Sequence, residues 1–267
     1  MTDQPSDRAG GVAGPTGHFV GRLTWDEIAR RIEAGAAAIL PIGAGAKEHG
    51  FHLPMNTDQV QAEWLASRLA ARADALIWPT LTYGHYPAFV AYAGSCSLSS
   101  PVFEAVVREI VEGLLGFGAA MVFVLDTGLS TVAPVERALA GLRTRARVRH
   151  LRPYDGPRYR AAAARIAQQS HGSHADELET SRMLALAPEL VVMRRAEASP
   201  PLPGEPRPGP LTPSDPGSPN YSRSGSFGDP TWASRAKGDI LLACMIDDLV
   251  EAATAALEEG TRPERDR

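Results

Sequence analysis

Short, continuous apolar runs alternate along this chain with longer amphipathic stretches. The runs "AAAILPIG" (36–43), "ALIWP" (75–79) and "AAMVFVLD" (119–126) are typical of strands buried on both faces, and further strands are expected near 147–151 and at "ELVVM" (189–193). The amphipathic stretches predict helices over 58–73, 100–118, about 176–187 and about 231–258. Thr57 is a candidate N-cap for the first of these helices, and Ser-Pro opens the second. This alternation predicts an α/β fold whose mainly parallel sheet is covered on both faces.

A segment rich in proline, glycine and serine interrupts the pattern at 196–230, and such a composition cannot form a regular element. A linker between two domains is one interpretation, but the residues that follow it are too few for an independent core. We therefore expect one domain over 20–260, with a surface excursion at about 196–222 in which residues 200–220 are mobile. Residues 1–19 lack the basic start and apolar stretch of a signal peptide, and we expect them to be a disordered lead-in.

Charge and cysteine content narrow the class of protein. The net charge is -4 over 267 residues, which argues against a nucleic-acid partner. The two cysteines, Cys96 and Cys244, lie far apart and imply no disulfide framework, so a reducing cytoplasm is the expected location. The sequence has no uncharged apolar run of the ~18 residues that a membrane helix needs, so no membrane association is expected.

The stretch "AKEHGFHLPMNTD" (46–58) concentrates histidine and acidic side chains directly after the first predicted strand. In an open parallel sheet, functional groups collect where strands end at their carboxyl edge. Mixed nitrogen and oxygen ligands suit Zn, Mn or Fe, so a metal site is one interpretation. A polar loop is the other, because a carboxylate such as Asp58 is also favoured at a helix N-terminus without any metal. The spacing by itself leaves both open.

Four segments in order resemble the creatininase (creatinine amidohydrolase) family. They are "LPIGAGAKEHGFHLPMNTD" (40–58), "YGHYPAFVAYAGSCSLS" (83–99), "GSHADELETSRMLALAPELV" (172–191) and "GSFGDPTWASRAKG" (225–238). The resemblance spans about 24–258 and implies a divergent member with a three-layer α/β sandwich. It further implies a homo-oligomer, commonly a hexamer, and a one- or two-metal site that hydrolyses C–N bonds of cyclic or linear amides.

The match departs from the family pattern at the metal ligands. With His49 at the first family histidine, Asp58 corresponds to the metal-bridging aspartate, but Lys47 and not Glu48 falls on the ligand glutamate. A one-residue bulge would bring Glu48 into that position. After the third strand the family carries a metal-binding histidine, which corresponds to Gly128 here. We therefore expect one divalent transition-metal ion (Zn, Mn or Fe) in place of a pair.

The resemblance also implies a role for each candidate side chain. The expected metal ligands are Glu48, His49 and Asp58; the expected catalytic residues are His174, as general acid/base, and Glu177; the expected substrate-binding residues are Lys47, His52 and His85.

Two functions follow from these assignments. The first is a metal-dependent amidohydrolase acting on a small amide. The alternative is a metal-poor member that binds a small ligand or partner without turnover, which Lys47 and the lost histidine favour.

Overall fold

The computed structural model of the protein describes residues 18–142, 145–199 and 209–261. These residues contain one sheet of four strands in the order β2-β1-β3-β4, and every neighbouring pair is parallel. The strands are β1 (Ala37–Ile42), β2 (Ala75–Ile77), β3 (Val122–Asp126) and β4 (Val148–Leu151). The sequence-based prediction of a parallel α/β sheet is confirmed.

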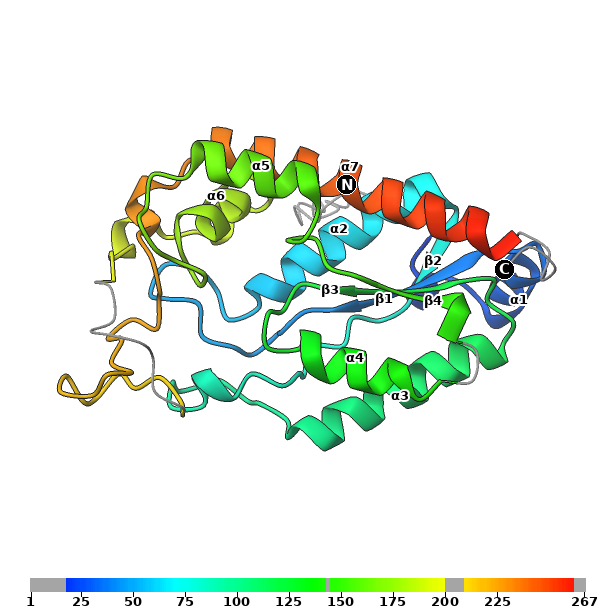
Figure 1. Ribbon diagram of the computed structural model, residues 1–267, viewed down its shortest axis with the longest axis horizontal. Coiled ribbons are helices and arrows are strands. Elements are labelled where there is room, and N and C mark those ends of the chain that lie inside the picture. The colour runs from blue at the N-terminus through cyan, green and yellow to red at the C-terminus, as the bar shows by residue number, and fades with distance from the viewer. Residues whose placement is uncertain (1–17, 143–144, 200–208, 262–267) are drawn as a thin grey trace, which may run out of the picture.

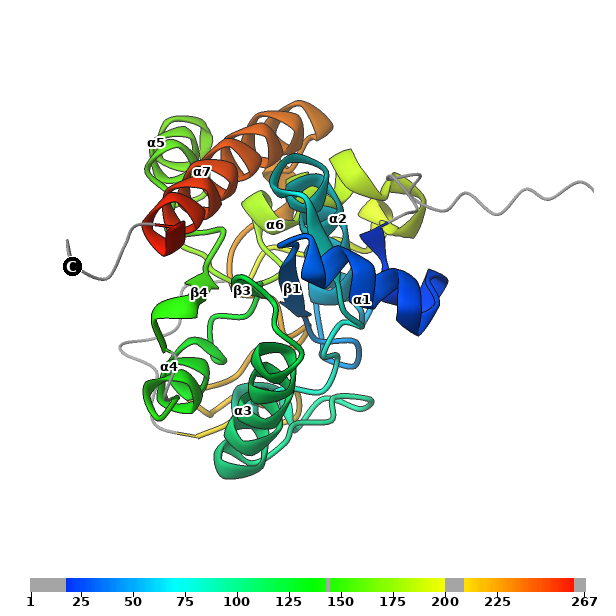
Figure 2. The same ribbon diagram turned by 90° about the vertical axis from the view of Figure 1, so that its right-hand side faces the viewer.

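Helices cover both faces of this sheet (Figures 1 and 2). The α-helices are α1 (Trp25–Glu33), α2 (Thr57–Ala73), α3 (Ser100–Gly116), α4 (Val132–Ala140), α5 (Pro157–Ile166), α6 (Glu177–Leu186) and α7 (Arg235–Thr261). The helices α2, α5 and α7 pack on one face, and α3 and α4 pack on the other. The molecule is thus a three-layer α/β sandwich, as expected.

Alternate side chains of each central strand enter opposite cores. Ile39 of β1 and Phe123 of β3 face the α2, α5 and α7 layer, whereas Leu40 and Val124 face the α3 and α4 layer. All of these side chains are fully buried. Because both faces are covered, the strands need apolar residues at every position, which explains their continuous hydrophobic runs.

Several predicted boundaries differ from the structure. The segment predicted as the strand 189–193 instead forms parts of two short 3-10 turns, η5 (Pro188–Leu190) and η6 (Met193–Arg195). Pro188 follows the end of α6 directly, and Val192 N donates to the His52 carbonyl, so this segment pairs with a loop and not with the sheet. Thr57 is the first residue of α2, and Asn56 is its N-cap. The helices α1, α4 and α5 lie outside the predicted elements.

Part of the Pro/Gly-rich segment, residues 200–208, lies outside the described residues. From 209 to 229 the chain forms no helix or strand, and its later part is packed against the segment that leads into α6: Phe227 N donates to the His174 carbonyl over 2.8 Å. The mobility of the excursion and the domain limits stay predictions. None of the described helices is sufficiently long and apolar to cross a lipid bilayer.

Candidate functional site

The candidate site lies at the carboxyl edge of the sheet. The loop after β1 supplies Lys47, Glu48 and His49, α2 supplies Asp58, and the segment that leads into α6 supplies His174. Beside them lies a cavity of about 350 Å³. Its wall includes Lys47, Asp58, Phe89, Ser130, Tyr154, Tyr159, His174, Glu179 and Arg182. The predicted loop therefore does reach a pocket.

Lys47 and Asp58 form a buried ion pair in this wall. The Lys47 Nζ lies 2.6 Å from Asp58 Oδ2, with the two side chains 9% and 4% exposed. Burial alone would raise the pKa of Asp58, but the Lys47 ammonium beside it holds that pKa well below its usual range. Burial likewise opposes the charge on Lys47, but Asp58, Glu179 and Glu48 together outweigh it, so the pKa of Lys47 is raised. Both groups are ionised at neutral pH.

Glu48 points to a different partner. Its Oε2 lies 3.1 Å from His174 Nε2, and its Oε1 accepts a hydrogen bond from Gly50 N. Burial would raise the pKa of the Glu48 carboxyl, but His174 and the Gly50 amide lower it further than burial raises it. Burial would lower the pKa of His174, and Glu48 raises it instead. Glu48 therefore serves as the counter-charge and hydrogen-bond acceptor of His174.

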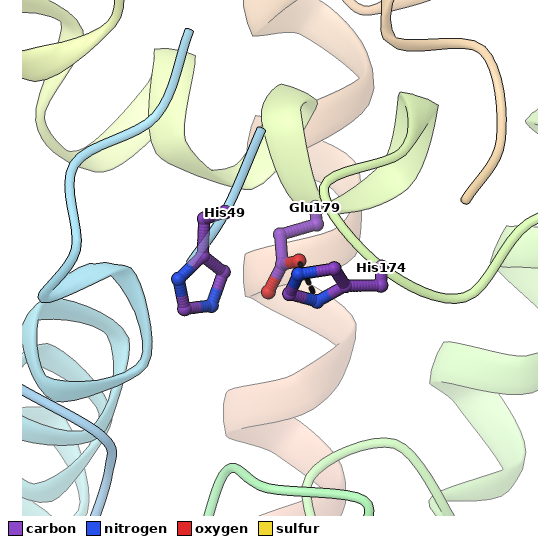
Figure 3. A group of neighbouring side chains, drawn as sticks. All are labelled: His49, His174 and Glu179. Atoms are coloured by element: carbon purple, nitrogen blue, oxygen red, sulfur yellow. Dashed lines mark ion pairs between the residues drawn. The ribbon is translucent and has the colours of Figure 1, made fainter. Parts of the chain in front are cut away.

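Among the residues that the structure describes, a single group of three has the spacing of metal ligands: His49, His174 and Glu179 (Figure 3). One nitrogen or oxygen from each lies within 4.8 Å of the other two, and all three residues are buried. The His174 Nδ1 is 3.9 Å from Glu179 Oε2. The two imidazole rings lie 4.8 Å apart between centroids. In Figure 3 the three side chains converge from separate segments.

The hydrogen bonds around this group orient its rings. The His49 Nδ1–H donates to the Lys47 carbonyl over 2.9 Å, and the His174 Nε2–H donates to the Glu48 carbonyl over 2.9 Å. A carbonyl can only accept, so each ring keeps its other nitrogen as a possible ligand. Metal-binding histidines commonly donate their second N–H in this way. Two imidazoles and one carboxylate, so oriented, suit Zn, Mn or Fe.

Glu179 is held as firmly as the histidines. Its Oε2 accepts from Ala175 N over 2.8 Å, and its Oε1 accepts from Gln61 Nε2 over 3.1 Å. The Arg182 Nη2 lies 3.7 Å from Glu179 Oε1. Burial would raise the pKa of Glu179, but His49, His174 and Arg182 lower it to about 2. The carboxylate is thus ionised and fixed toward the two histidines.

Glu177, expected to face the site, lies on the other side of α6. Its Oε1 is 2.5 Å from Lys237 Nζ in α7, and its Oε2 accepts from the backbone N–H groups of Gln168 and Gln169. This corrects the position expected for Glu177, and Glu179 faces the cavity instead. The reason is helical geometry, since residues two apart point in different directions. The Asp176 side chain accepts from Glu179 N as the N-cap, which sets where the helix begins.

The predicted substrate-binding histidines are placed apart from the cavity. His52 is buried, its Nε2 is 2.8 Å from Thr180 Oγ1, and burial lowers its pKa to about 4. His85 is half-buried, and its Nδ1 donates to the Leu98 carbonyl. Neither contributes to the cavity wall, whereas Lys47, the third predicted substrate-binding residue, does.

The predicted ligand set is therefore only partly brought together. Lys47, not Glu48, approaches Asp58, so the proposed bulge that would carry Glu48 to that position is not present. His49 is shared by the two arrangements: its Nε2 is 3.2 Å from Asp58 Oδ1. The sequence pattern did not single out Glu179. Glu177 and Glu179 are two residues apart in one helix, and which of them faces the cavity depends on where α6 begins.

Comparisons with known proteins agree with this architecture. The creatininase family model, described as creatinine amidohydrolase, matches residues 21–253. The creatinine amidohydrolase of Pseudomonas putida is 29% identical over 258 residues, covering 88% of this chain and 95% of that protein. The mycofactocin precursor peptide peptidase of Mycobacterium tuberculosis is 29% identical over 226 residues, covering 79% and 82%.

Solved structures give the same result. A crystal structure of creatinine amidohydrolase superposes with a TM-score of 0.76 at 28% identity, covering 89% of this chain and 97% of that chain. Two further creatininases at 27% identity, each covering 89% of this chain, superpose with TM-scores of 0.74 and 0.75. One is described as a manganese form, and the other is a mutant described as a Zn–Zn type.

Proposed function

This chain belongs to the creatininase family, and on that premise we propose that it is a metal-dependent amidohydrolase with a single divalent transition-metal ion. The observation that carries the proposal is the convergence of His49, His174 and Glu179 within 4.8 Å, each oriented by hydrogen bonds. In this proposal His174 is a ligand, in place of the proton carrier that the resemblance implies.

The chemistry that such an ion supplies when bound is polarisation of a carbonyl group and activation of water near neutral pH. Asp58 is ionised and lies 3.2 Å from His49 Nε2, so it helps to position this ring, but with its pKa held well below the usual range it is too weak a base to take a proton from the attacking water. The Lys47 ammonium lies in the same wall, where its charge can stabilise the oxygen anion that develops from the amide carbonyl. Both groups are fixed before the substrate arrives.

The cavity limits the substrate to a small amide or the end of a chain. Its volume of about 350 Å³ is near the lower end of the range for ligand pockets. Phe89 and Tyr154 give it aromatic surface, and Leu129 in its wall is 61% exposed, so the cavity opens to solvent there. The two relatives differ in the substrate that their names give, creatinine, a cyclic amide, or a precursor peptide, and these are the two substrate classes to compare. A related mutant creatininase has been solved complexed with creatine.

The test begins with metal analysis of protein purified without chelator. We expect about one transition-metal ion per chain, and loss of most of it in His49→Ala and in His174→Ala. His18→Ala is the control, because His18 binds the Ala75 carbonyl at the opposite, amino end of β2. Creatinine and short peptides are then assayed for C–N bond hydrolysis with and without chelator. Protein that stays metal-free after incubation with Zn²⁺ or Mn²⁺ contradicts the proposal.

The alternative function, binding a small ligand or partner without turnover, is favoured by two observations. Lys47 already neutralises Asp58, and the position of the family histidine is Gly128. A protein that binds neither Zn²⁺ nor Mn²⁺ but still binds creatinine or a peptide, measured by calorimetry, would support this alternative.

A further inference from the structure

The ion pair between Lys47 and Asp58 has the geometry of a cation bound to a ligand carboxylate. The Lys47 Nζ is 2.6 Å from Asp58 Oδ2, and the other oxygen of Asp58 is 3.2 Å from His49 Nε2. Asp58 thus lies between a cation and the imidazole nitrogen assigned to the bound ion, and a buried carboxylate is a common ligand of divalent transition metals. Here the Lys47 ammonium supplies, beside Asp58, the positive charge that a metal ion would otherwise supply.

Each acidic side chain around the site has a partner of its own. Glu48 is paired with His174, Asp58 with Lys47, and Glu179 lies nearest to Arg182. A second divalent ion at Asp58 would have to displace the ammonium or lie beside it, and like charges in a buried site repel strongly. The cavity on the side of the pair toward Asp126 and Gly128 has a volume of about 10 Å³, about the space of one water molecule, so an ion there would keep almost none of its hydration water.

We propose that Lys47 is a built-in cation that takes the place of a second metal ion beside Asp58 and thereby limits the protein to one exchangeable ion. This inference rests on the proposed function for the identity of that one ion, at His49, His174 and Glu179. It assigns Lys47 the role of setting the metal count, and it removes Asp58 from the ligands of the bound ion. A solved relative described as a Zn–Zn type shows that two ions can occupy a member of this family.

The charge-reversal variant Lys47→Glu tests the proposal directly. It removes the built-in cation and adds a second carboxylate beside Asp58 and His49. Each protein is loaded with Zn²⁺ or Mn²⁺, desalted, and its metal counted by mass spectrometry per 28.4 kDa chain. We expect about one ion in the natural protein and about two in Lys47→Glu. An unchanged count in Lys47→Glu overturns the proposal, and so does a count of two in the natural protein.

Lys237→Glu is the matched control. Lys237 is a half-buried lysine that is likewise paired with a buried carboxylate, Glu177, and among the described residues no histidine contacts that pair. The variant makes the same change in charge, and its metal count is expected to equal that of the natural protein. An additional ion in Lys237→Glu would show that any added carboxylate captures metal, and would overturn the assignment to Lys47.

The double variant Lys47→Met with Asp58→Asn covers the case in which Lys47→Glu does not fold. Replacing both members of a buried ion pair by neutral residues commonly preserves stability, whereas removing one does not. We expect this variant to keep one ion, because neither residue ligates it. Loss of the ion there contradicts the proposal.

The same counts separate this inference from the proposed function. The count in the natural protein tests the ion at His49, His174 and Glu179, so a value of zero refutes the proposed function. The difference between Lys47→Glu and the natural protein tests the lysine, whatever the first value is.

Discussion

At the residue scale, Glu177 and Glu179 have the same side chain but contact different partners. Glu177 is bound to Lys237 and to backbone amides behind α6, whereas Glu179 lies beside His174 at the cavity. Both are buried. Their difference is therefore one of direction and partners, not of chemistry.

These different surroundings predict that a Glu→Gln substitution affects metal affinity at one position and stability at the other. Glu179→Gln is expected to lower Zn²⁺ affinity by more than roughly 10-fold, because an ionised candidate ligand becomes neutral. Glu177→Gln is expected to leave the affinity unchanged and to lower the free energy of unfolding by about 1–3 kcal/mol, because Lys237 loses its charged partner. Calorimetric Zn²⁺ titration and urea unfolding measure the two effects. Equal Zn²⁺ affinities in the two variants would contradict the assignment of Glu179 as a ligand.

Gly225 makes a second prediction at this scale. A Cβ atom there would fall on the Glu48 carboxylate, and its φ of +85° is one that other residues adopt with strain. Gly225→Ala is expected to cost about 1–3 kcal/mol of unfolding free energy and, by moving Glu48 away from His174, to weaken metal binding. The control Gly217→Ala changes an exposed glycine with negative φ in the same segment. Similar melting temperatures for the two variants would show that Glu48 does not need this contact.

At the element scale, α6 positions Glu179, and α7 supports α6 from behind. Gly238 of α7 lies where the two helices cross: a Cβ there would overlap the Ser181 carbonyl, and Ser234 N donates to Ser181 Oγ over 3.1 Å. The absence of a side chain is what lets the two backbones approach. Any group at this position must push α6 toward the cavity or separate the helices.

We therefore expect Gly238→Ala to lower the free energy of unfolding by about 1–3 kcal/mol, the usual cost of overpacking. Gly113→Ala is the control, because Gly113 lies in α3 and a Cβ there meets no other atom within 4 Å. In that exposed helix position alanine should stabilise the protein by about 0.5–1 kcal/mol. Chemical denaturation of both variants is the measurement, and a neutral Gly238→Ala would contradict the close crossing.

At the scale of the whole molecule, three layers bring the loop after β1, the end of β3 and the start of α6 to one edge. The resemblance to the family predicts that several such molecules assemble, with a hexamer expected. Light scattering at micromolar concentration should give a mass that is a multiple of 28.4 kDa, the mass of one chain. A stable species of single-chain mass would contradict the prediction.

The strands and the long helices were predictable because their signal is local. β1 and β3 carry continuous apolar residues, since both of their faces are buried, and this pattern is visible without knowledge of the fold. The helix α1 was not predicted, although Ile28 and Ile32 have the four-residue spacing of one helix face; it is only nine residues long, and none of its residues is buried. The strand expected at 189–193 is wrong, because a short apolar run has the same pattern in a strand and in packed 3-10 turns.

By itself, the sequence determined the parallel α/β architecture, the family, and the loop that carries Lys47, His49 and Asp58 to the sheet edge. Only the tertiary structure decided which charges meet: Lys47 with Asp58, Glu48 with His174, and Glu179 with the two histidines. Periodicity reports which face of an element is buried, and it therefore fixes the layers. The pairing of side chains from distant segments depends on the start of α6 and the path of a loop within a few ångströms, which no local pattern encodes.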